Sequence, residues 1–313
     1  MSDIDHIVKT LNKELGDFIQ PLSELADVEA IPFGIPSLDY ITGIGGCPRG
    51  RLTEIFGGQS GGKSSLCLSL VAEAQKLGLK CAYIDLEFAL TKELATLHNV
   101  KMDEVIYVQP VTGEDTFKTM EKLLENDVKL IIIDSVSAML TEAEEEKEFG
   151  EQTIGLQARM MSAGLRKLIG MVKSQNAAIV FINQVRDDIA KFGFGPKTTT
   201  SGGKALRFYA SLRLNIERIA WVADSAKEKI GMTLKVTVNK NKVGVPQKST
   251  EVEYYFLSGF DKATDALRLC VHKGFMEVKG KTYYQGSKEI GNKKEAVQVA
   301  LEIYNQPTNA TKA

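Results

Sequence analysis

The chain has 313 residues, of which 43% are hydrophobic and 25% charged, as expected for a globular protein with a large buried core. Its formal net charge of −1 excludes a globally basic surface, so any contact with nucleic acid must come from local basic segments. No apolar run is as long as a membrane span, the start is unlike a signal peptide, and the four cysteines form no C-x-x-C pair, so we expect a cytoplasmic protein with no membrane contact, zinc site or disulfides.

Residues 1–30 are predicted to form an N-terminal helix and a linker. Apolar residues recur at steps of three and four along residues 1–22, which gives the helix one apolar face. Pro21 and the prolines of the following loop separate this helix from the rest of the chain. The pattern alone leaves two possibilities open: the helix folds onto its own core, or it docks on a neighbouring subunit.

Residues 31–260 are predicted to form the main domain, in which apolar strands alternate with helices. Near-continuous apolar strands joined by helical crossovers predict an α/β fold with a parallel sheet covered on both faces. The strands are expected at residues 52–56, 80–86, 105–108, 129–134, 177–183, 211–217 and 232–239, and the helices near 63–77, 91–98, 114–125 and 156–175.

The first of these strands leads into a glycine-rich loop and then a helix. Gly57, Gly62, Lys63 and Ser64 have the spacing of a P-loop, G-x-x-x-x-G-K-[ST]. Glycines let backbone N–H groups approach a phosphate closely, and the start of the following helix adds a favourable field. The strand-before, helix-after context favours this interpretation over an ordinary glycine-rich turn. The nucleotide-binding residues are predicted to be Gly57, Gly58, Gln59, Ser60, Gly61, Gly62, Lys63, Ser64 and Ser65, with Lys63 on the β- and γ-phosphates.

Polar side chains end three further strands, where ligands of a parallel sheet bind. Asp134 ends an apolar strand and is expected to hold Mg²⁺ together with Ser64, although such an Asp by itself is more often a turn residue. Glu87 is the expected general base for ATP hydrolysis, with Asp85 in support; the alternative is a surface acid at a helix start. Gln184 is expected to contact the γ-phosphate, against the alternative of a loop amide.

Lys240 and Lys242 stand two apart, so both side chains leave the same face of a strand. A solvated pair that protects a sheet edge is the ordinary interpretation. The alternative is a pair of cations that meets a neighbouring subunit's γ-phosphate, as an arginine finger does.

Two long loops stand out in the main domain, and the second carries the residue types that suit single-stranded nucleic acid. The first, residues 144–155, opens a helix that carries Arg159 and Arg166 on one face. The second, residues 185–203, mixes cations, aromatic rings and hydroxyls, which suits phosphates and stacked bases, although a lid over a small-molecule site is an alternative. Its candidate DNA contacts are Arg186, Lys191, Phe192, Phe194, Lys197, Thr198, Thr199, Thr200, Gly202 and Gly203.

Residues 261–313 are predicted to form a small α+β domain followed by a disordered polar tail. A helix near 261–273 precedes a hairpin at 275–284 that turns at Gly280, and a last helix is expected near 292–304.

The chain resembles the bacterial RecA recombinase family over residues 36–290. The matching stretches keep their order and spacing: Leu52–Ser65, Ile84–Leu90, Ile131–Val136, Gly155–Met161, Phe181–Arg186, Thr198–Thr200, Ala205–Ser211 and Lys240–Lys242. The resemblance implies a RecA-like P-loop ATPase core with a twisted, mostly parallel sheet, an N-terminal helix that packs on a neighbour, and a small C-terminal domain. It also implies an ATP- and Mg²⁺-dependent filament that pairs single-stranded DNA with homologous duplex. In that filament the two long loops, with Arg159 and Arg166 on the helix that follows the first, line the DNA axis. Phe208, Lys240 and Lys242 lie in the subunit interface.

Several positions depart from the family pattern. Thr91 and Leu94 stand where an Asp and a Tyr usually lie near the adenine, and Ile154 replaces a Met. Ser201 is an insertion, and Asp187 with Asp188 makes the second loop less basic. The short C-terminal part without an acidic tail resembles phage-encoded members. Two other functions fit the same core: a hexameric ring helicase or motor, and an ATP-binding recombination mediator without strand exchange.

Overall fold

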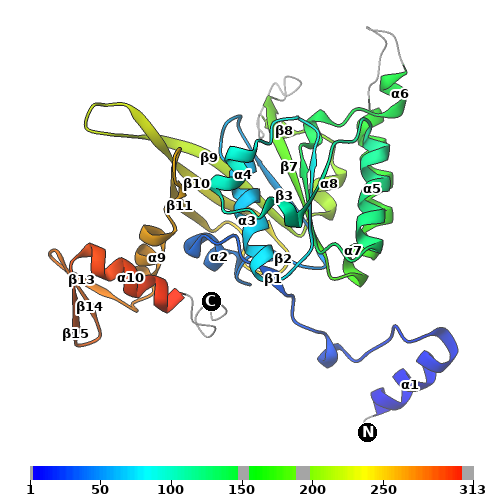
Figure 1. Ribbon diagram of the computed structural model, residues 1–313. Coiled ribbons are helices and arrows are strands. Elements are labelled where there is room, and N and C mark those ends of the chain that lie inside the picture. The colour runs from blue at the N-terminus through cyan, green and yellow to red at the C-terminus, as the bar shows by residue number, and fades with distance from the viewer. Residues whose placement is uncertain (1–2, 147–154, 188–197, 305–313) are drawn as a thin grey trace, which may run out of the picture.

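The computed structural model describes residues 3–146, 155–187 and 198–304, and its centre is a ten-stranded sheet (Figure 1). The strand order is β12-β11-β10-β9-β3-β7-β6-β4-β5, with β8 paired to the end of β7. The strands are β3 (Arg51–Gly57), β4 (Cys81–Asp85), β5 (Val105–Val108), β6 (Leu130–Asp134), β7 (Ala178–Asp187), β8 (Thr198–Thr200), β9 (Leu212–Ala223), β10 (Lys229–Asn241), β11 (Ser249–Tyr255) and β12 (Gly259–Phe260).

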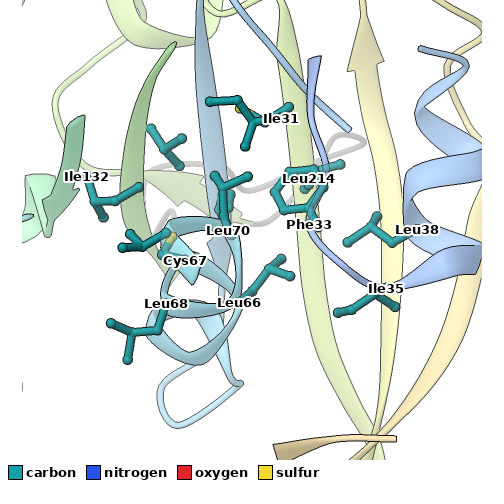
Figure 2. Packing of buried hydrophobic residues seen from close by; sticks show 14 of the residues in the cluster. Ile31, Phe33, Ile35, Leu38, Leu66, Cys67, Leu68, Leu70, Ile132 and Leu214 are labelled. Carbon is teal, nitrogen blue, oxygen red and sulfur yellow. The ribbon is translucent and has the colours of Figure 1, made fainter. Parts of the chain in front are cut away.

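Helices cover both faces of the sheet, as the sequence predicted. Successive residues of β6 alternate between two apolar clusters: Ile132 packs with residues of α3, and Ile131 and Ile133 pack with residues of α5 and α7. Figure 2 shows the first cluster, in which Leu66, Cys67, Leu68 and Leu70 of α3 lie near Ile132 and Leu214. The main helices are α2 (Pro36–Thr42), α3 (Lys63–Lys76), α4 (Lys92–Leu97), α5 (Gly113–Glu125), α7 (Leu156–Ser174) and α8 (Ala205–Tyr209). Short elements complete this part of the chain: η1 (Leu22–Glu24), β1 (Ala30–Ile31), β2 (Cys47–Pro48), η2 (Met102–Glu104), η3 (Val136–Ala138) and α6 (Glu142–Glu145).

The sheet is parallel only from β9 to β5, which corrects the expectation of helical crossovers throughout. β9 and β10 are antiparallel and longer than predicted, and Figure 1 shows their hairpin extending from the body. Residues 224–228 join them, and so short a connection cannot make a parallel crossover. β11 and β12, which the sequence analysis did not identify, continue this antiparallel half. The predicted loop segment Thr198–Thr200 is also a strand, with Thr200 paired to Val185.

Residues 262–304 form a small α+β unit with its own apolar cluster. Its elements are α9 (Lys262–His272), β13 (Glu277–Lys279), β14 (Thr282–Gln285), β15 (Lys288–Gly291) and α10 (Lys293–Tyr304), so the predicted hairpin has a third strand. Two carboxylates tie the unit to the main domain. Asp265 accepts hydrogen bonds from the backbone N–H and hydroxyl of Ser37 at 2.7 Å, and Asp39 accepts one from the Tyr304 hydroxyl at 2.8 Å. The predicted tail lies outside the described residues.

Helix α1 (Asp3–Leu15) buries none of its residues and lies apart from the sheet (Figure 1). Ile4 and Ile7 are 60% and 55% exposed, so the predicted apolar face is not covered by the chain's own core. The sequence left open that this helix folds onto the core of its own chain, and the structure does not show that arrangement. Across the described ranges, no helix is long and apolar enough to span a membrane.

Candidate active site

The predicted P-loop lies between β3 and α3 and lines a pocket of about 420 Å³. Glycine is required by space at two of its positions. A Cβ on Gly57 would lie 2.1 Å from the carbonyl oxygen of Ile216. Gly62 has φ of +79°, and its Cβ would lie 2.8 Å from Leu234. The pocket is lined by Gln59, Ser60, Gly61, Gly62, Lys63, Ser64, Ser65, Glu87, Asp134, Ile182, Gln184 and Met232.

Lys63 is buried at the head of this loop. Its Nζ donates to the carbonyl oxygens of Gly58 at 2.7 Å and Gly57 at 3.2 Å. Burial lowers the pKa of the ammonium group, and the nearby carboxylates of Asp134 and Glu87 oppose that shift. A buried cation in a loop of glycine N–H groups is suited to an anionic ligand such as a triphosphate.

Ser64 and Asp134 meet, as predicted for a magnesium site. The Ser64 hydroxyl donates to Asp134 Oδ2 at 2.7 Å, and the Tyr83 hydroxyl donates to the same oxygen at 2.7 Å. Burial raises the pKa of the Asp134 carboxyl, and these two hydrogen bonds lower it. A hydroxyl and a carboxylate beside a phosphate-binding loop fit Mg²⁺, which takes few protein ligands and completes its shell with phosphates and water.

Glu87 and Gln184, which also line the pocket, meet as well. Glu87 Oε1 accepts hydrogen bonds from Gln184 Nε2 at 2.9 Å and from the Ser135 hydroxyl. The sequence analysis did not identify Ser135, although its position directly after Asp134 was a usable signal. The structure therefore brings the predicted base and the predicted γ-phosphate contact together beside the P-loop.

Asp85 supports the segment that carries Glu87. Its carboxylate accepts from the backbone N–H groups of Glu87 at 3.2 Å, Ala89 at 3.4 Å and Leu90 at 3.0 Å. The Tyr107 hydroxyl donates to the same carboxylate at 2.9 Å. The sequence analysis identified neither Tyr83 nor Tyr107, but Tyr83 precedes Asp85 by two residues and so shares its strand face.

Lys240 and Lys242 lie beside Phe208 and do not line the pocket of their own chain. Lys240 Nζ donates to the carbonyl oxygens of Arg207 at 2.6 Å and Phe208 at 2.9 Å, and Lys242 Nζ donates to that of Phe208 at 3.3 Å. Burial, Lys242 and Arg213 lower the pKa of Lys240. The Phe208 side chain is 70% exposed, so the two cations and the ring form one surface cluster.

Some of the predicted DNA contacts are exposed and others are packed inward. Arg159 and Arg166 are exposed on α7. Thr200 is buried and accepts a hydrogen bond from Arg207 at 3.1 Å. Gly202 and Gly203 pack so closely on neighbouring residues that a Cβ on either would come within 2.9 Å of a side-chain carbon. Arg186, Thr198 and Thr199 are described by backbone alone, and Lys191, Phe192, Phe194 and Lys197, like Ile154 and Asp188, lie outside the described residues.

The end of β7 connects the pocket with the second loop. Asn183 Nδ2 donates to the buried Glu54 at 3.0 Å and to the carbonyl oxygen of Ser201 at 3.0 Å. The backbone N–H of Gln184 donates to Asn183 Oδ1 at 2.9 Å. A change at the side chain of Gln184 is therefore only one residue from a contact with the loop.

Comparison with known proteins agrees with this geometry. The family model for the RecA N-terminal domain matches residues 2–261. Protein RecA of Thermus aquaticus is 40% identical over 296 residues, covering 93% of this chain and 87% of that protein. Protein RecA of Geobacter sulfurreducens is 43% identical over 279 residues, covering 89% and 82%. The crystal structure of the RadB recombinase covers 74% of this chain and 98% of its own with a TM-score of 0.55 at 20% identity, which shows a shared fold. The chain therefore belongs to the RecA family of recombinases.

Proposed function

We propose that the chain binds ATP with Mg²⁺ in the pocket beside α3 and hydrolyses it within a filament on single-stranded DNA. As a RecA family member it is a recombinase and a DNA-dependent ATPase. One observation carries the assignment of the site. The P-loop lysine, the Ser64–Asp134 pair and the Glu87–Gln184 pair all converge on one pocket of about 420 Å³.

The triphosphate is bound by the loop amides and by Lys63. Lys63 exchanges its two carbonyl partners for phosphate oxygens, which are stronger acceptors because they are charged. Ser64 and Asp134 would hold Mg²⁺, which would supply positive charge against the developing negative charge of the transferred phosphoryl group.

Glu87 acts on the attacking water. Its carboxylate orients the water, takes a proton from it, and so promotes in-line attack at the γ-phosphorus while the bond to ADP breaks. The hydrogen bonds from Ser135 and Gln184 hold Glu87 Oε1 towards the pocket. Gln184 also contacts the γ-phosphate, and its exchange between phosphate and Glu87 reports the nucleotide state to Asn183 and the second loop.

The neighbouring subunit completes the site. Lys240 and Lys242 are too far from the pocket to line it in their own chain, yet both are held on the surface beside the exposed Phe208. We assign them to the γ-phosphate of an adjacent subunit, so that ATP occupancy favours assembly. The uncovered apolar face of α1 supports its role as a contact with a neighbour.

DNA is bound by the two long loops and by α7. Exposed Arg159 and Arg166 are placed to contact phosphates, and the second loop supplies cations and aromatic rings. Buried Thr200 and the closely packed Gly202 and Gly203 instead fix the base of that loop.

Strand exchange between a circular single strand and a homologous linear duplex tests the proposal. We expect joint molecules only with ATP and Mg²⁺, and none with Lys63→Ala. Electron microscopy with single-stranded DNA and a slowly hydrolysed ATP analogue should show helical filaments. Closed rings under those conditions would identify a ring motor, and ATP turnover that DNA does not stimulate would identify a mediator.

A further inference from the structure

Tyr83 and Tyr107 are direct neighbours on β4 and β5, which pair in parallel. Their side chains lie on one face of the sheet and line an apolar cavity of about 280 Å³ between the sheet, α3 and α4. This cavity shares no lining residue with the nucleotide pocket. Both hydroxyls nevertheless reach towards that pocket, because each donates to a carboxylate at the carboxyl end of β4 or β6.

The carboxylate that Tyr107 contacts organises the segment bearing Glu87. Asp85 Oδ1 accepts from the N–H groups of Glu87 and Ala89, and Oδ2 accepts from Leu90 and from the Tyr107 hydroxyl. Glu87, Phe88 and Ala89 are exposed, so apolar burial contributes little to holding this segment. Its remaining backbone anchors are the hydrogen bonds from Leu86 and Glu87 to the carbonyl oxygen of Asp134.

We propose that Tyr107 is a positioning residue for ATP hydrolysis, acting through Asp85 on the segment that holds Glu87. The hydroxyl fixes the rotation of the Asp85 carboxylate so that both of its oxygens face the backbone N–H groups of residues 87–90. Without it, the carboxylate rotates and Glu87 spends less time oriented towards the attacking water. Because a small misplacement of a catalytic group is costly, a distant hydroxyl can affect the rate. This inference rests on the proposed role of Glu87.

Tyr107→Phe removes only the hydroxyl and is the direct test. We expect kcat with saturating single-stranded DNA to fall about three- to tenfold, which is less than the full value of one hydrogen bond to a charged group because Tyr107 acts only through Asp85. The KM for ATP and the affinity for a slowly hydrolysed analogue should stay within about twofold of wild type, since one hydrogen bond outside the pocket is worth little in binding. Tyr284→Phe on β14, far from the nucleotide pocket, is the control for a lost tyrosine hydroxyl and should leave kcat unchanged.

Tyr83→Phe is the matched comparison on the neighbouring strand. Its hydroxyl holds Asp134, the proposed Mg²⁺ ligand, so its loss should raise the Mg²⁺ concentration needed for half-maximal turnover. Tyr107→Phe should leave that Mg²⁺ dependence unchanged. If either substitution acted only by destabilising the fold, it would not change kcat in one variant and the Mg²⁺ dependence in the other.

A double-mutant cycle with Asp85→Asn decides whether Tyr107 acts through Asp85. The Asn oxygen can keep the Glu87 and Ala89 contacts, while its amide replaces the oxygen that accepts from both Leu90 and Tyr107. We expect Tyr107→Phe to have a clearly smaller effect on kcat in the Asp85→Asn background, because the tyrosine hydroxyl can there only accept from the amide and no longer donates to a carboxylate. An unchanged kcat in Tyr107→Phe alone, or an equal fall in both backgrounds, overturns the inference. Wild-type turnover in Glu87→Gln would instead overturn the proposed function, so the two failures are distinguishable.

Discussion

Replacing Glu87 by glutamine tests the chemistry assigned to the site, because the change keeps the shape of the side chain and removes its basicity. Glu87 Oε1 accepts from Ser135 and Gln184, and an amide oxygen in its place can keep both hydrogen bonds. The side chain is exposed, so we expect a loss of at most about 1 kcal/mol in unfolding free energy. That corresponds to a fall of no more than about 4 °C in Tm for a chain of this size.

The effect on turnover should be far larger. A positioned general base contributes about 100- to 10,000-fold, so the activation barrier should rise by about 3–5 kcal/mol. Lys63, Ser64 and Asp134 are unchanged, so ATP affinity should stay within about twofold of wild type and DNA-bound filaments should persist longer.

Phosphate release at saturating single-stranded DNA measures this rate, and equilibrium binding of ATP measures affinity separately. Glu93→Gln makes the same charge change on exposed α4, outside the pocket lining, and should turn over at the wild-type rate. A Glu87→Gln rate within about threefold of wild type would refute the assignment of Glu87 as the base.

Three further predictions follow from particular contacts. Gly57→Ala places a Cβ 2.1 Å from a carbonyl oxygen and should lower the free energy of unfolding, measured by urea titration, by about 2–4 kcal/mol. The control Gly58→Ala meets no atom within 4 Å and should leave stability nearly unchanged. Equal stabilities of the two variants would contradict this packing. The double variant Lys240→Ala/Lys242→Ala should still bind an ATP analogue as isolated subunits but should lose DNA-stimulated turnover and filament assembly. Lys235→Ala on the same strand is the control. Normal filaments in the double variant would place Lys240 and Lys242 outside the interface. Burial raises the pKa of Asp39 from 3.8 to about 8. Between these two values the folded chain holds a proton that the unfolded chain has released. The free energy of unfolding should therefore fall as the pH rises from 6.5 to 8, by at most about 1.4 kcal/mol per pH unit. Asp39→Asn should remove that slope in urea titrations, and a slope that survives the substitution would assign it to other groups.

The position of Asp39 also indicates what its titration would affect. Asp39 accepts hydrogen bonds from the backbone N–H groups of Phe33 at 2.6 Å and Gly34 at 3.0 Å, and from the Tyr304 hydroxyl. It therefore joins α2 to the last helix. Asp265 makes a second such link to Ser37. The C-terminal unit is therefore attached through two buried carboxyl groups, and its attachment should share the pH dependence of overall stability.

The chemistry of the nucleotide pocket could be predicted from the sequence because it depends on local patterns. The spacing of Gly57, Gly62, Lys63 and Ser64 fixes a loop between a strand and a helix, whatever the rest of the chain does. Asp134 ends a continuous apolar run, and the carboxyl ends of parallel strands meet at one edge of a sheet. In the structure these two predicted residues are in contact, because the Ser64 hydroxyl donates to Asp134 at 2.7 Å.

The antiparallel half of the sheet was not predictable in the same way. Most residues of β11 are exposed or only half-buried, so the strand lacks the continuous apolar run that marks a buried strand. β9 and β10 both read as apolar strands, and their direction depends on the short connection between them. Strand β8 (Thr198–Thr200) could not be predicted either, because it forms only by pairing with β7, which does not adjoin it in the sequence.

By itself, the sequence determined that this chain has a glycine-rich loop with P-loop spacing, a carboxylate at the end of an apolar strand and an amphipathic N-terminal helix, because glycine spacing, strand ends and apolar periodicity act over a few residues. Only the tertiary structure decided that Glu87 faces Gln184, that Tyr107 holds Asp85, and that Lys240 and Lys242 lie away from their own pocket. The reason is physical: these relations depend on which strands become neighbours, and strand order follows from the burial of side chains across the whole sheet.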